Sequence, residues 1–292
     1  MKIVAIVPFL NEETHIGVML DSVSAQQRLP DRLLLVDDGS SDGGAQIAAE
    51  FVGRNPYATL LRRPVRPADR DRMARAHEWR AFERGLASTE RDYDVVAKLD
   101  ADLKLSPDFF AELERQFEAD PWLGIAGAYV SAEGPDGELV RQRCPPEHVE
   151  GETRFYRRRC LEAIWPIPPI LGWDTIDEVR ARMRGWRTAS IEVPSGDPVH
   201  LRRMGSYDGI LRGYRRHGWC AYAYGAHPLH VLLAGVSRMR DRPLLLCGLN
   251  YLVGWALAGL RRPARAEPEL RRFVRREHRL RMRNLVLGRA RT

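Results

Sequence analysis

The sequence is poor in cysteine, and the spacing of the four cysteines excludes two kinds of site. Cys144, Cys160, Cys220 and Cys247 form no C-x-x-C pair and match no zinc-ligand spacing. A structural zinc module and a redox-active dithiol are therefore excluded. We expect these residues to be reduced, partly buried thiols of a cytosolic protein.

We expect no targeting segment in this chain, and no internal repeat or low-complexity linker is visible in it. The first residues, "MKIVAIVPFLNEE", are apolar over too short a run for a signal sequence, and no small-residue cleavage site follows them. We therefore expect a cytoplasmic protein. Its composition is that of an ordinary globular chain, and 292 residues suffice for one sizeable domain with appendages.

The body of the chain has almost no net charge, although the whole sequence has a formal charge of +7. Residues 261–292 hold twelve Arg and three Glu, a net +9, so residues 1–260 sum to −2. A nucleic-acid binder would spread a basic stripe with aromatic residues over its domain. We therefore expect no nucleic-acid partner, and we assign the basicity to the C-terminal tail.

The first half of the chain alternates between two kinds of segment. Short apolar runs at 2–10 and 32–37 predict buried strands, and the segments at 11–26 and 45–54 have the apolar spacing of helices. This alternation predicts an α/β fold with a mostly parallel sheet flanked by helices. In such sheets ligands bind beyond the carboxyl ends of the strands.

Acidic residues stand where two of these strands end. Asp37 and Asp38 follow one apolar run, and Asp100 and Asp102 follow another at 94–99. Burying such carboxylates in ionised form would cost several kcal/mol each without a compensating cation. Mg²⁺ or Mn²⁺ suits one or two carboxylates together with substrate phosphates. By itself, however, a D-x-D motif is weak evidence, because many solvated turns contain one.

Three segments together resemble the family 2 glycosyltransferases, inverting enzymes with the GT-A fold: "VAIVPFLNEE", "LLLVDDGSSD" and "VVAKLDADL". The resemblance covers roughly residues 1–225. A later segment, "LGWDTIDEVRARMRGWR", is similar to the family's G-E-D-x-x-x-x-x-R-x-x-x-x-G-W pattern, with Trp173 in place of the usual glutamate. "VHLRR" resembles the site of the late histidine that many GT-A enzymes use as a metal ligand.

The resemblance implies a role for each matching residue. The nucleotide-sugar donor would contact six of them: Pro8, Glu12, Asp37, Asp38, Gly39 and Asp100. Asp102 would bind a divalent metal ion, Mn²⁺ or Mg²⁺, with His200 as an additional ligand. Asp174 would be the general base that takes the proton of the acceptor hydroxyl, and Asp177, one helical turn on, is its rival.

The predicted catalytic domain spans residues 1–225, with a nucleotide-binding half at about 1–105 and an acceptor half at about 106–225. A helical extension over 226–292 follows. Its uncharged run 243–260 fits a buried helix, a helix in the membrane interface or a membrane span. The basic tail 261–292 favours peripheral contact with anionic lipid on the inner face of the cell membrane.

The leading hypothesis is a metal-dependent, inverting and non-processive glycosyltransferase. Its acceptor would be a glycan or a lipid-linked molecule in cell-envelope or exopolysaccharide synthesis. Processive relatives carry a Q-x-x-R-W motif, which we do not find here. A nucleotidyltransferase is the second hypothesis, but the acidic "PFLNEE" stands where it would need a basic, glycine-rich loop. The third is a non-enzymatic, basic membrane-binding protein.

Overall fold

The structure is a computed structural model of the chain. It describes residues 1–65, 76–134, 137–142, 144–202 and 209–286. The chain divides into two compact units. The sheet unit comprises Met1–Pro169 and Arg184–Arg203, and the helical unit comprises Ile170–Met183 and Met204–Thr292.

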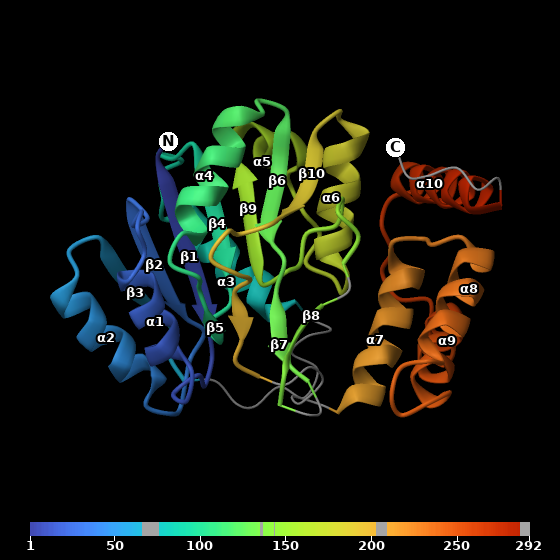
Figure 1. Ribbon diagram of the computed structural model, residues 1–292, viewed down its shortest axis with the longest axis horizontal. Helices are drawn as coiled ribbons and strands as arrows, with labels where there is room; N and C mark the ends of the chain where they lie inside the picture. The colour runs from blue at the N-terminus through green and yellow to red at the C-terminus, as the bar shows by residue number, and fades with distance from the viewer. Residues whose placement is uncertain (66–75, 135–136, 143, 203–208, 287–292) are drawn as a thin grey trace. The chain divides into compact units, whose positions relative to one another are not determined.

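A seven-stranded sheet in the order β10-β6-β9-β4-β1-β2-β3 forms the centre of the sheet unit (Figure 1). Its strands are β1 (Ile3–Phe9), β2 (Arg32–Asp37), β3 (Ala58–Arg62), β4 (Val95–Leu99), β6 (Leu123–Ala128), β9 (Thr153–Arg157) and β10 (Arg187–Ile191). All neighbours pair in parallel except β9, which is antiparallel to both β4 and β6. Its helices are α1 (Ile16–Ser24), α2 (Gly44–Arg54), α3 (His77–Ala87), α4 (Phe109–Ala119) and α5 (Arg158–Ile164).

The central strands are buried along their whole length. Every residue of β1 and β4 is buried, as is all of β2 after its first residue. Strands covered by helices on both faces need continuous apolar runs, and the sequence supplies them. The predicted α/β fold with a mostly parallel sheet is therefore confirmed.

A smaller sheet has the order β5-β11-β7-β8. Its strands are β5 (Leu103–Lys104), β7 (Ser131–Glu133), β8 (Leu139–Arg141) and β11 (Val199–His200). β5 follows β4 after a three-residue interval, and β11 pairs antiparallel with it. This sheet therefore starts at the carboxyl end of β4, the edge at which the ligand was predicted.

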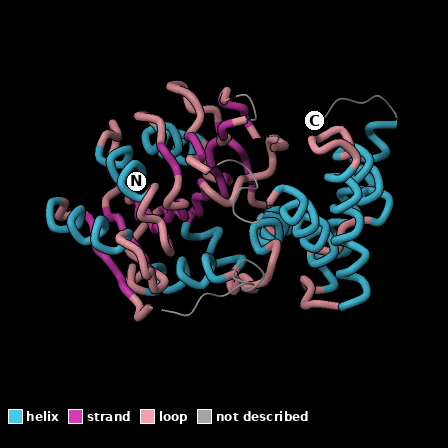
Figure 2. The backbone as a smooth tube through the Cα atoms, turned by 90° about the horizontal axis from the view of Figure 1, so that it is seen from below, coloured by secondary structure: helices cyan, strands magenta, loops and turns pink. Residues whose placement is uncertain are grey.

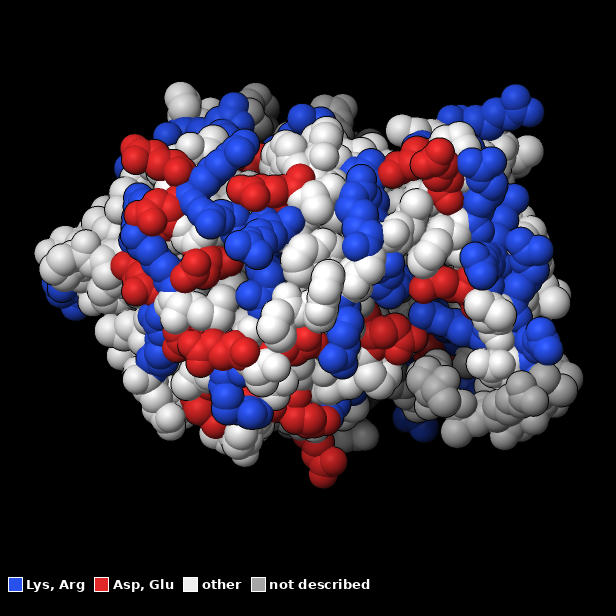
Figure 3. All heavy atoms as spheres, turned by 90° about the horizontal axis from the view of Figure 1, so that it is seen from above, with Lys and Arg blue, Asp and Glu red and all other residues white. Residues whose placement is uncertain are grey.

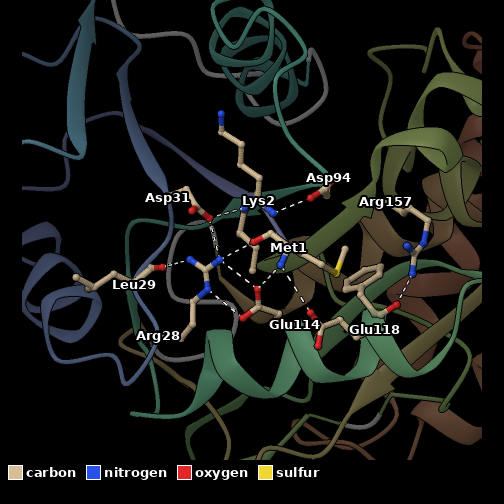
Figure 4. Close-up of polar contacts among 11 residues, drawn as sticks. Met1, Lys2, Arg28, Leu29, Asp31, Asp94, Glu114, Glu118 and Arg157 are labelled. Atoms are coloured by element: carbon tan, nitrogen blue, oxygen red, sulfur yellow. Dashed lines mark hydrogen bonds and ion pairs between the residues drawn. The ribbon is translucent and has the colours of Figure 1, made fainter.

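A polar cluster holds the opposite, amino end of the large sheet (Figure 4). The Met1 ammonium group donates to Glu114 Oε1 at 2.9 Å, and Arg28 Nε donates to Glu114 Oε2 at 3.0 Å. The Ile3 amide, at the start of β1, donates to Asp31 Oδ2 at 2.7 Å. The hydrogen bond to Glu114 raises the pKa of the Met1 amino group. These contacts fasten β1 to α4 at the end of the sheet remote from the predicted site.

The described part of the helical unit consists of helices and loops (Figure 2). The helices are α6 (Trp173–Met183), α7 (Ile210–Ala223), α8 (Pro228–Arg238), α9 (Leu246–Arg261) and α10 (Pro268–Val286). α7 and α9 cross closely, because a Cβ atom at Gly218 would lie 1.9 Å from the Tyr251 carbonyl oxygen and one at Gly254 would lie 2.0 Å from that of Arg215. Only glycine at both positions permits this approach. The predicted C-terminal helical extension is confirmed.

The predicted apolar run 243–260 corresponds largely to α9. One side of this helix, including Cys247, Tyr251 and Ala258, is buried, whereas Leu249 and Leu260 are exposed. Among the described residues, no helix combines the length and apolarity required to cross a membrane. The four cysteines are free, as predicted.

α10 carries the predicted basic tail, but its apolar side is already occupied. Leu270 and Val274 are buried against Ile176 and Val179 of α6. Arg180 binds both carboxylate oxygens of Glu267, at 2.7 and 3.0 Å. Lys and Arg side chains crowd the visible face of the helical unit around α10 (Figure 3). The tail is therefore a docked helix with a cationic outer surface, and it offers few apolar side chains to a membrane.

Candidate active site

Asp37, at the carboxyl end of β2, shapes the loop that follows it. The side chain is fully buried, and its Oδ1 atom accepts from the amides of Gly39 at 3.1 Å and Ser40 at 2.8 Å. Gly39 has φ +100°, a conformation that a side chain would strain. One oxygen of the Asp37 carboxylate therefore fixes the turn, while the other, Oδ2, accepts from Arg62 Nε of β3 at 3.4 Å.

Asp38 is buried among cationic side chains. Its Oδ1 atom accepts from Arg84 Nη2 of α3 at 2.6 Å and from Arg63 Nη1 after β3 at 3.4 Å. The His77 Nδ1 atom lies 4.0 Å from Asp38 Oδ2. An acid and three potential cations thus meet at the carboxyl ends of β2 and β3.

Lys98 is a charged residue within the apolar core, since it lies inside β4 and is 1% exposed. Its ammonium group contacts the carboxylates of Asp100 and Glu78, and it donates to the Gly151 carbonyl oxygen at 2.8 Å. A buried ammonium group needs such partners, because desolvation of an unpaired charge costs several kcal/mol. Lys98 thereby fixes the orientation of the first acid of the D-x-D motif.

Asp102 and His200 are brought together by the backbone pairing of the small sheet. β5 begins directly after Asp102, and β11 runs antiparallel to it with His200 opposite Leu103. The Leu201 amide donates to the Asp102 carbonyl oxygen at 2.8 Å. As a result, His200 Nε2 lies 3.4 Å from Asp102 Oδ2, although the two residues are far apart in the sequence.

The hydrogen bonds of His200 prepare it to be a ligand. Its Nδ1 atom lies 2.8 Å from the Arg202 carbonyl oxygen, and a carbonyl can only accept, so Nδ1 carries the proton. In the neutral ring the lone pair is then on Nε2, which faces Asp102. Metal-binding histidines are commonly oriented by such a hydrogen bond from the other ring nitrogen.

The site concentrates negative charge in a buried place. Burial, followed by the Asp100 carboxylate, raises the pKa of Asp102. Burial, followed by the Glu150 and Asp100 carboxylates, raises the pKa of Glu152 to about 7. Burial lowers the pKa of His200, but the carboxylates of Asp102, Glu152 and Asp100 and the hydrogen bond with the Arg202 carbonyl oxygen together raise that pKa above its ordinary value. A divalent cation at this position would reverse the shifts of the carboxylates.

The donor atoms of this cluster fit a hard divalent cation. Asp100, Asp102 and His200 each offer one ligand atom, and these atoms lie within 4.8 Å of one another. Another group of three potential ligands within the described residues comprises Cys144, His148 and Glu150. The thiol in that group suits softer metals such as zinc, whereas carboxylate oxygens suit Mg²⁺ and Mn²⁺. The cluster at the end of β4 is therefore the better match.

Arg202 connects this cluster to the end of β1. Its Nη2 atom contacts Glu12 Oε2, and its Nε atom lies 3.2 Å from Asp102 Oδ2. Burial is the main reason that the pKa of Glu12 is raised. Pro8, four residues earlier, pairs with Val36 of β2. The carboxyl ends of β1 and β4 thus contribute to one polar site.

Asp174 and Asp177 belong to the helical unit and lie in the first two turns of α6. Asp174 is partly exposed, and its Oδ1 atom accepts from the Thr175 amide at 3.0 Å. Asp177 is fully buried, and its Oδ1 atom accepts from the Glu178 amide at 2.6 Å. Of the two acids, Asp174 is therefore the one accessible to a substrate.

Comparison with known proteins gives the family directly. The model for glycosyl transferase family 2 matches residues 4–170, which is more than half of the chain. The chain belongs to glycosyl transferase family 2. The predicted family is therefore confirmed, and the site formed by Asp100 and Asp102 lies within the matched range. His200 and Asp174 of this glycosyltransferase lie beyond it.

Solved structures of low sequence identity share the fold of this glycosyltransferase. A mannosyltransferase from Pyrobaculum calidifontis, in complex with GDP-Man and Mn²⁺, has a TM-score of 0.60 at 19% identity, with 89% of this chain and 87% of that chain covered. TarS 1–349 of S. aureus has a TM-score of 0.51 at 16% identity, covering 88% and 71%. Glucosyl-3-phosphoglycerate synthase from Mycobacterium tuberculosis, with Mn²⁺, UDP and glucosyl-3-phosphoglycerate, has 0.50 at 22%, covering 72% and 75%.

The structure brings some of the predicted site residues into one cluster and places others beside it. Asp100, Asp102 and His200 form one cluster, and Glu12 reaches it through Arg202. Asp37 contacts its own loop through Oδ1 and Arg62 of β3 through Oδ2.

Sequence reasoning missed several charged residues of the glycosyltransferase site, among them Lys98, Glu78 and Glu152, and Arg63 and Arg84 beside Asp38. A signal existed for Lys98 alone, because it is the one charged residue inside an apolar run.

Proposed function

We propose that this protein is a metal-dependent, inverting and non-processive glycosyltransferase that moves a hexose from a nucleoside-diphosphate donor to an acceptor hydroxyl. Convergence of Asp100, Asp102 and His200 on one point is the observation that carries the proposal. The complexes of the related folds with GDP-Man and Mn²⁺ or with UDP and Mn²⁺ support it.

Asp102 and His200 would hold the cation, with Asp100 beside them near the ribose and the donor sugar. A bound divalent cation neutralises the diphosphate and stabilises it as it leaves. Lys98 holds Asp100 in place, and the His200 Nδ1 proton is retained by the Arg202 carbonyl oxygen. Pro8, Asp37, Asp38 and Gly39 would border the nucleotide.

Asp174 would act as the general base. In an inverting transfer the acceptor hydroxyl loses its proton while its oxygen attacks the anomeric carbon from the side opposite the diphosphate. One ionised carboxylate within hydrogen-bonding reach of that hydroxyl suffices. The partial exposure of Asp174 supports this role over Asp177, which is fully buried. The extent of the catalytic domain, residues 1–225, stays a prediction.

The acceptor would be a glycan or a lipid-linked molecule of the cell envelope, and the enzyme would work on the cytoplasmic face of the membrane. The basic outer face of α10 supports peripheral contact with anionic lipid. Each basic residue near such a surface contributes about 1 kcal/mol.

Substitution of Asp102 tests the metal site. Asp102→Asn keeps the size of the side chain but removes the charge, so Mn²⁺-dependent affinity for UDP or GDP should fall by at least tenfold in isothermal titration. Asp21→Asn, which changes an exposed acid of α1, is the matched control and should bind as the wild type does. Unchanged affinity in Asp102→Asn would refute the assignment of Asp102 as a ligand.

A further inference from the structure

Large apolar side chains are exposed along α8 and along the connection from α8 to α9. On α8 these are Leu229, Leu232, Leu233 and Val236, with exposed fractions of 49%, 51%, 49% and 53%. In the connection and the first turn of α9 they are Leu244, Leu245, Leu246 and Leu249, with 62%, 64%, 44% and 50%. A contiguous apolar surface of this kind marks an interaction site. We call these eight residues the leucine surface.

The α8 part of the leucine surface is one face of that helix. Its four residues follow the spacing i, i+3, i+4 and i+7, which places side chains on a single stripe. Such a stripe normally faces the core, but in α8 the buried residues are Val231 and Gly235 on another side. Gly235 packs against Leu252 of α9, since a Cβ atom there would lie 2.6 Å from that side chain. Because α8 packs on α9 through its other side, the leucine stripe of α8 stays exposed to solvent.

Arginines accompany the leucine surface. Arg240 and Arg242 are exposed and lie four and two residues before Leu244. Residues 228–262 contain five Arg and one acid, Asp241, a net charge of +4. The hydroxyl of Tyr214 donates to Asp241 Oδ2 at 2.8 Å, so this acid is engaged within the unit. The surface thus combines aliphatic side chains with unbalanced positive charge.

This combination favours a lipid bilayer over a second copy of the chain. A symmetric dimer would bring the same net positive charge from both copies to one interface, and like charges there repel. Interfaces between proteins are also enriched in aromatic residues and methionine, whereas this surface is leucine and valine. Anionic phosphate groups, in contrast, complement the arginines while the acyl region accepts the leucines.

We propose that the leucine surface inserts into the interface of an anionic membrane and that α10 contributes mainly charge. This inference specifies the membrane contact and rests on that part of the proposed function. It differs from the expectation for the tail, because Leu270 and Val274 of α10 are buried against α6 and Leu280 is the one large apolar side chain in the described part of α10 that is exposed, at 49%. The apolar anchor is therefore α8 with its connection to α9.

Binding to vesicles tests the proposal with the full-length protein. We would measure co-sedimentation with vesicles of phosphatidylcholine and phosphatidylglycerol. Leu244→Gln combined with Leu245→Gln should weaken binding by more than about tenfold, because two exposed leucines lose their apolar contact with lipid. The matched control is Leu139→Gln with Val140→Gln, an apolar pair of β8 that is 60% and 56% exposed. This control should bind as the wild type does.

Two outcomes would overturn the proposal. One is equal vesicle binding by both double variants. The other is a wild-type dimer in analytical ultracentrifugation that Leu244→Gln with Leu245→Gln converts to a monomer, which would assign the surface to a second copy. Affinity for UDP or GDP with Mn²⁺ is measured in parallel. Loss of vesicle binding with that affinity intact supports the proposal, and a wild type that binds no nucleotide refutes the transferase proposal instead.

Discussion

At the scale of single residues, the environment of each acid determines what it can do. Asp37 accepts two backbone hydrogen bonds and shapes a loop, whereas Asp102 lies 3.4 Å from a histidine whose lone pair faces it. Asp174 is partly exposed and Asp177 is not. Aspartates at the ends of strands and helices therefore differ in what they can do, because their hydrogen bonds and their exposure differ.

The general base can be identified by comparing Asp174→Asn with Asp177→Asn. Asp174→Asn removes the proton acceptor, so the transfer rate should fall by about 10²–10⁴-fold while the affinity for the nucleoside diphosphate stays unchanged. Asp177→Asn changes a buried side chain and should mainly lower stability. Single-turnover transfer and nucleotide binding are measured for both. Retained transfer in Asp174→Asn together with loss in Asp177→Asn would move the role to Asp177.

Lys98 offers a second test at this scale. Lys98→Met removes the buried ammonium group that contacts Asp100 and Glu78. The free energy of unfolding should fall by about 1–2 kcal/mol, less than for a fully buried pair, because the carboxylates of Asp100 and Glu78 that lose their partner are 22% and 40% exposed. Lys104→Met, at an exposed position of β5, is the control and should have little effect in urea denaturation. Equal stability of the two variants would contradict the role of Lys98.

At the scale of elements, two histidines join α8 to α10. The rings of His230 and His278 stack with centroids 3.7 Å apart, and His278 Nδ1 accepts from the His227 amide at 3.2 Å. Burial lowers the pKa of His230 to about 4 and that of His278 to about 3. The nearby Arg281 lowers both pKa values further, so both rings are neutral at pH 7.

These shifts predict a loss of stability in acid. The ordinary pKa is 6.5, so below that pH the unfolded chain binds protons that the folded chain excludes until about pH 4. The stabilisation is complete above pH 6.5 and is lost as the pH falls. From pH 7 to pH 5 the free energy of unfolding should fall by about 2 kcal/mol because of this pair. This is about half of the full linkage energy of the two pKa shifts, and the other half is discounted for solvent exposure.

Urea denaturation of the wild type and His278→Phe at both pH values measures this effect. The variant keeps a ring in the α8–α10 contact but cannot be protonated there. Its free energy of unfolding should therefore depend less on pH than that of the wild type. Parallel pH dependences of the two proteins would show that the histidine pair does not sense acid.

At the scale of the whole molecule, the candidate functional residues are distributed over two units. Every candidate donor-binding and metal-binding residue, from Pro8 to His200, belongs to the sheet unit. Asp174 and the leucine surface belong to the helical unit. A chain with two compact units need not unfold in a single transition.

Ligand binding should therefore stabilise the units unequally. Mn²⁺ together with UDP or GDP, at a hundred times the dissociation constant, should stabilise the sheet unit by about 2.7 kcal/mol. Differential scanning calorimetry measures this as a higher unfolding temperature of that unit. The transition of the helical unit should stay in place. Because Asp102→Asn removes a proposed ligand, it should abolish the shift, and this identifies the transition that belongs to the sheet unit. If the ligand raised the unfolding temperature of every transition of the wild type equally, the two units would unfold together.

The sequence alone determined the order of strands and helices and the positions of the acids at the strand ends. Apolar runs and helical spacing are local patterns, and parallel strands necessarily bring their carboxyl ends to one edge. The family likewise followed from motifs that are contiguous in the chain. Asp100 and Asp102 could be predicted as a site for the same reason, because they are close together in the sequence.

Only the tertiary structure decided which side chains meet. The pairing of β5 with β11 sets His200 beside Asp102, and the packing of α10 on α6 hides Leu270 while the stripe on α8 stays exposed. An apolar stripe has the same spacing whether it faces a core or a membrane. What the stripe contacts depends on which other elements pack around it. This is a tertiary interaction, and the local sequence pattern does not contain it.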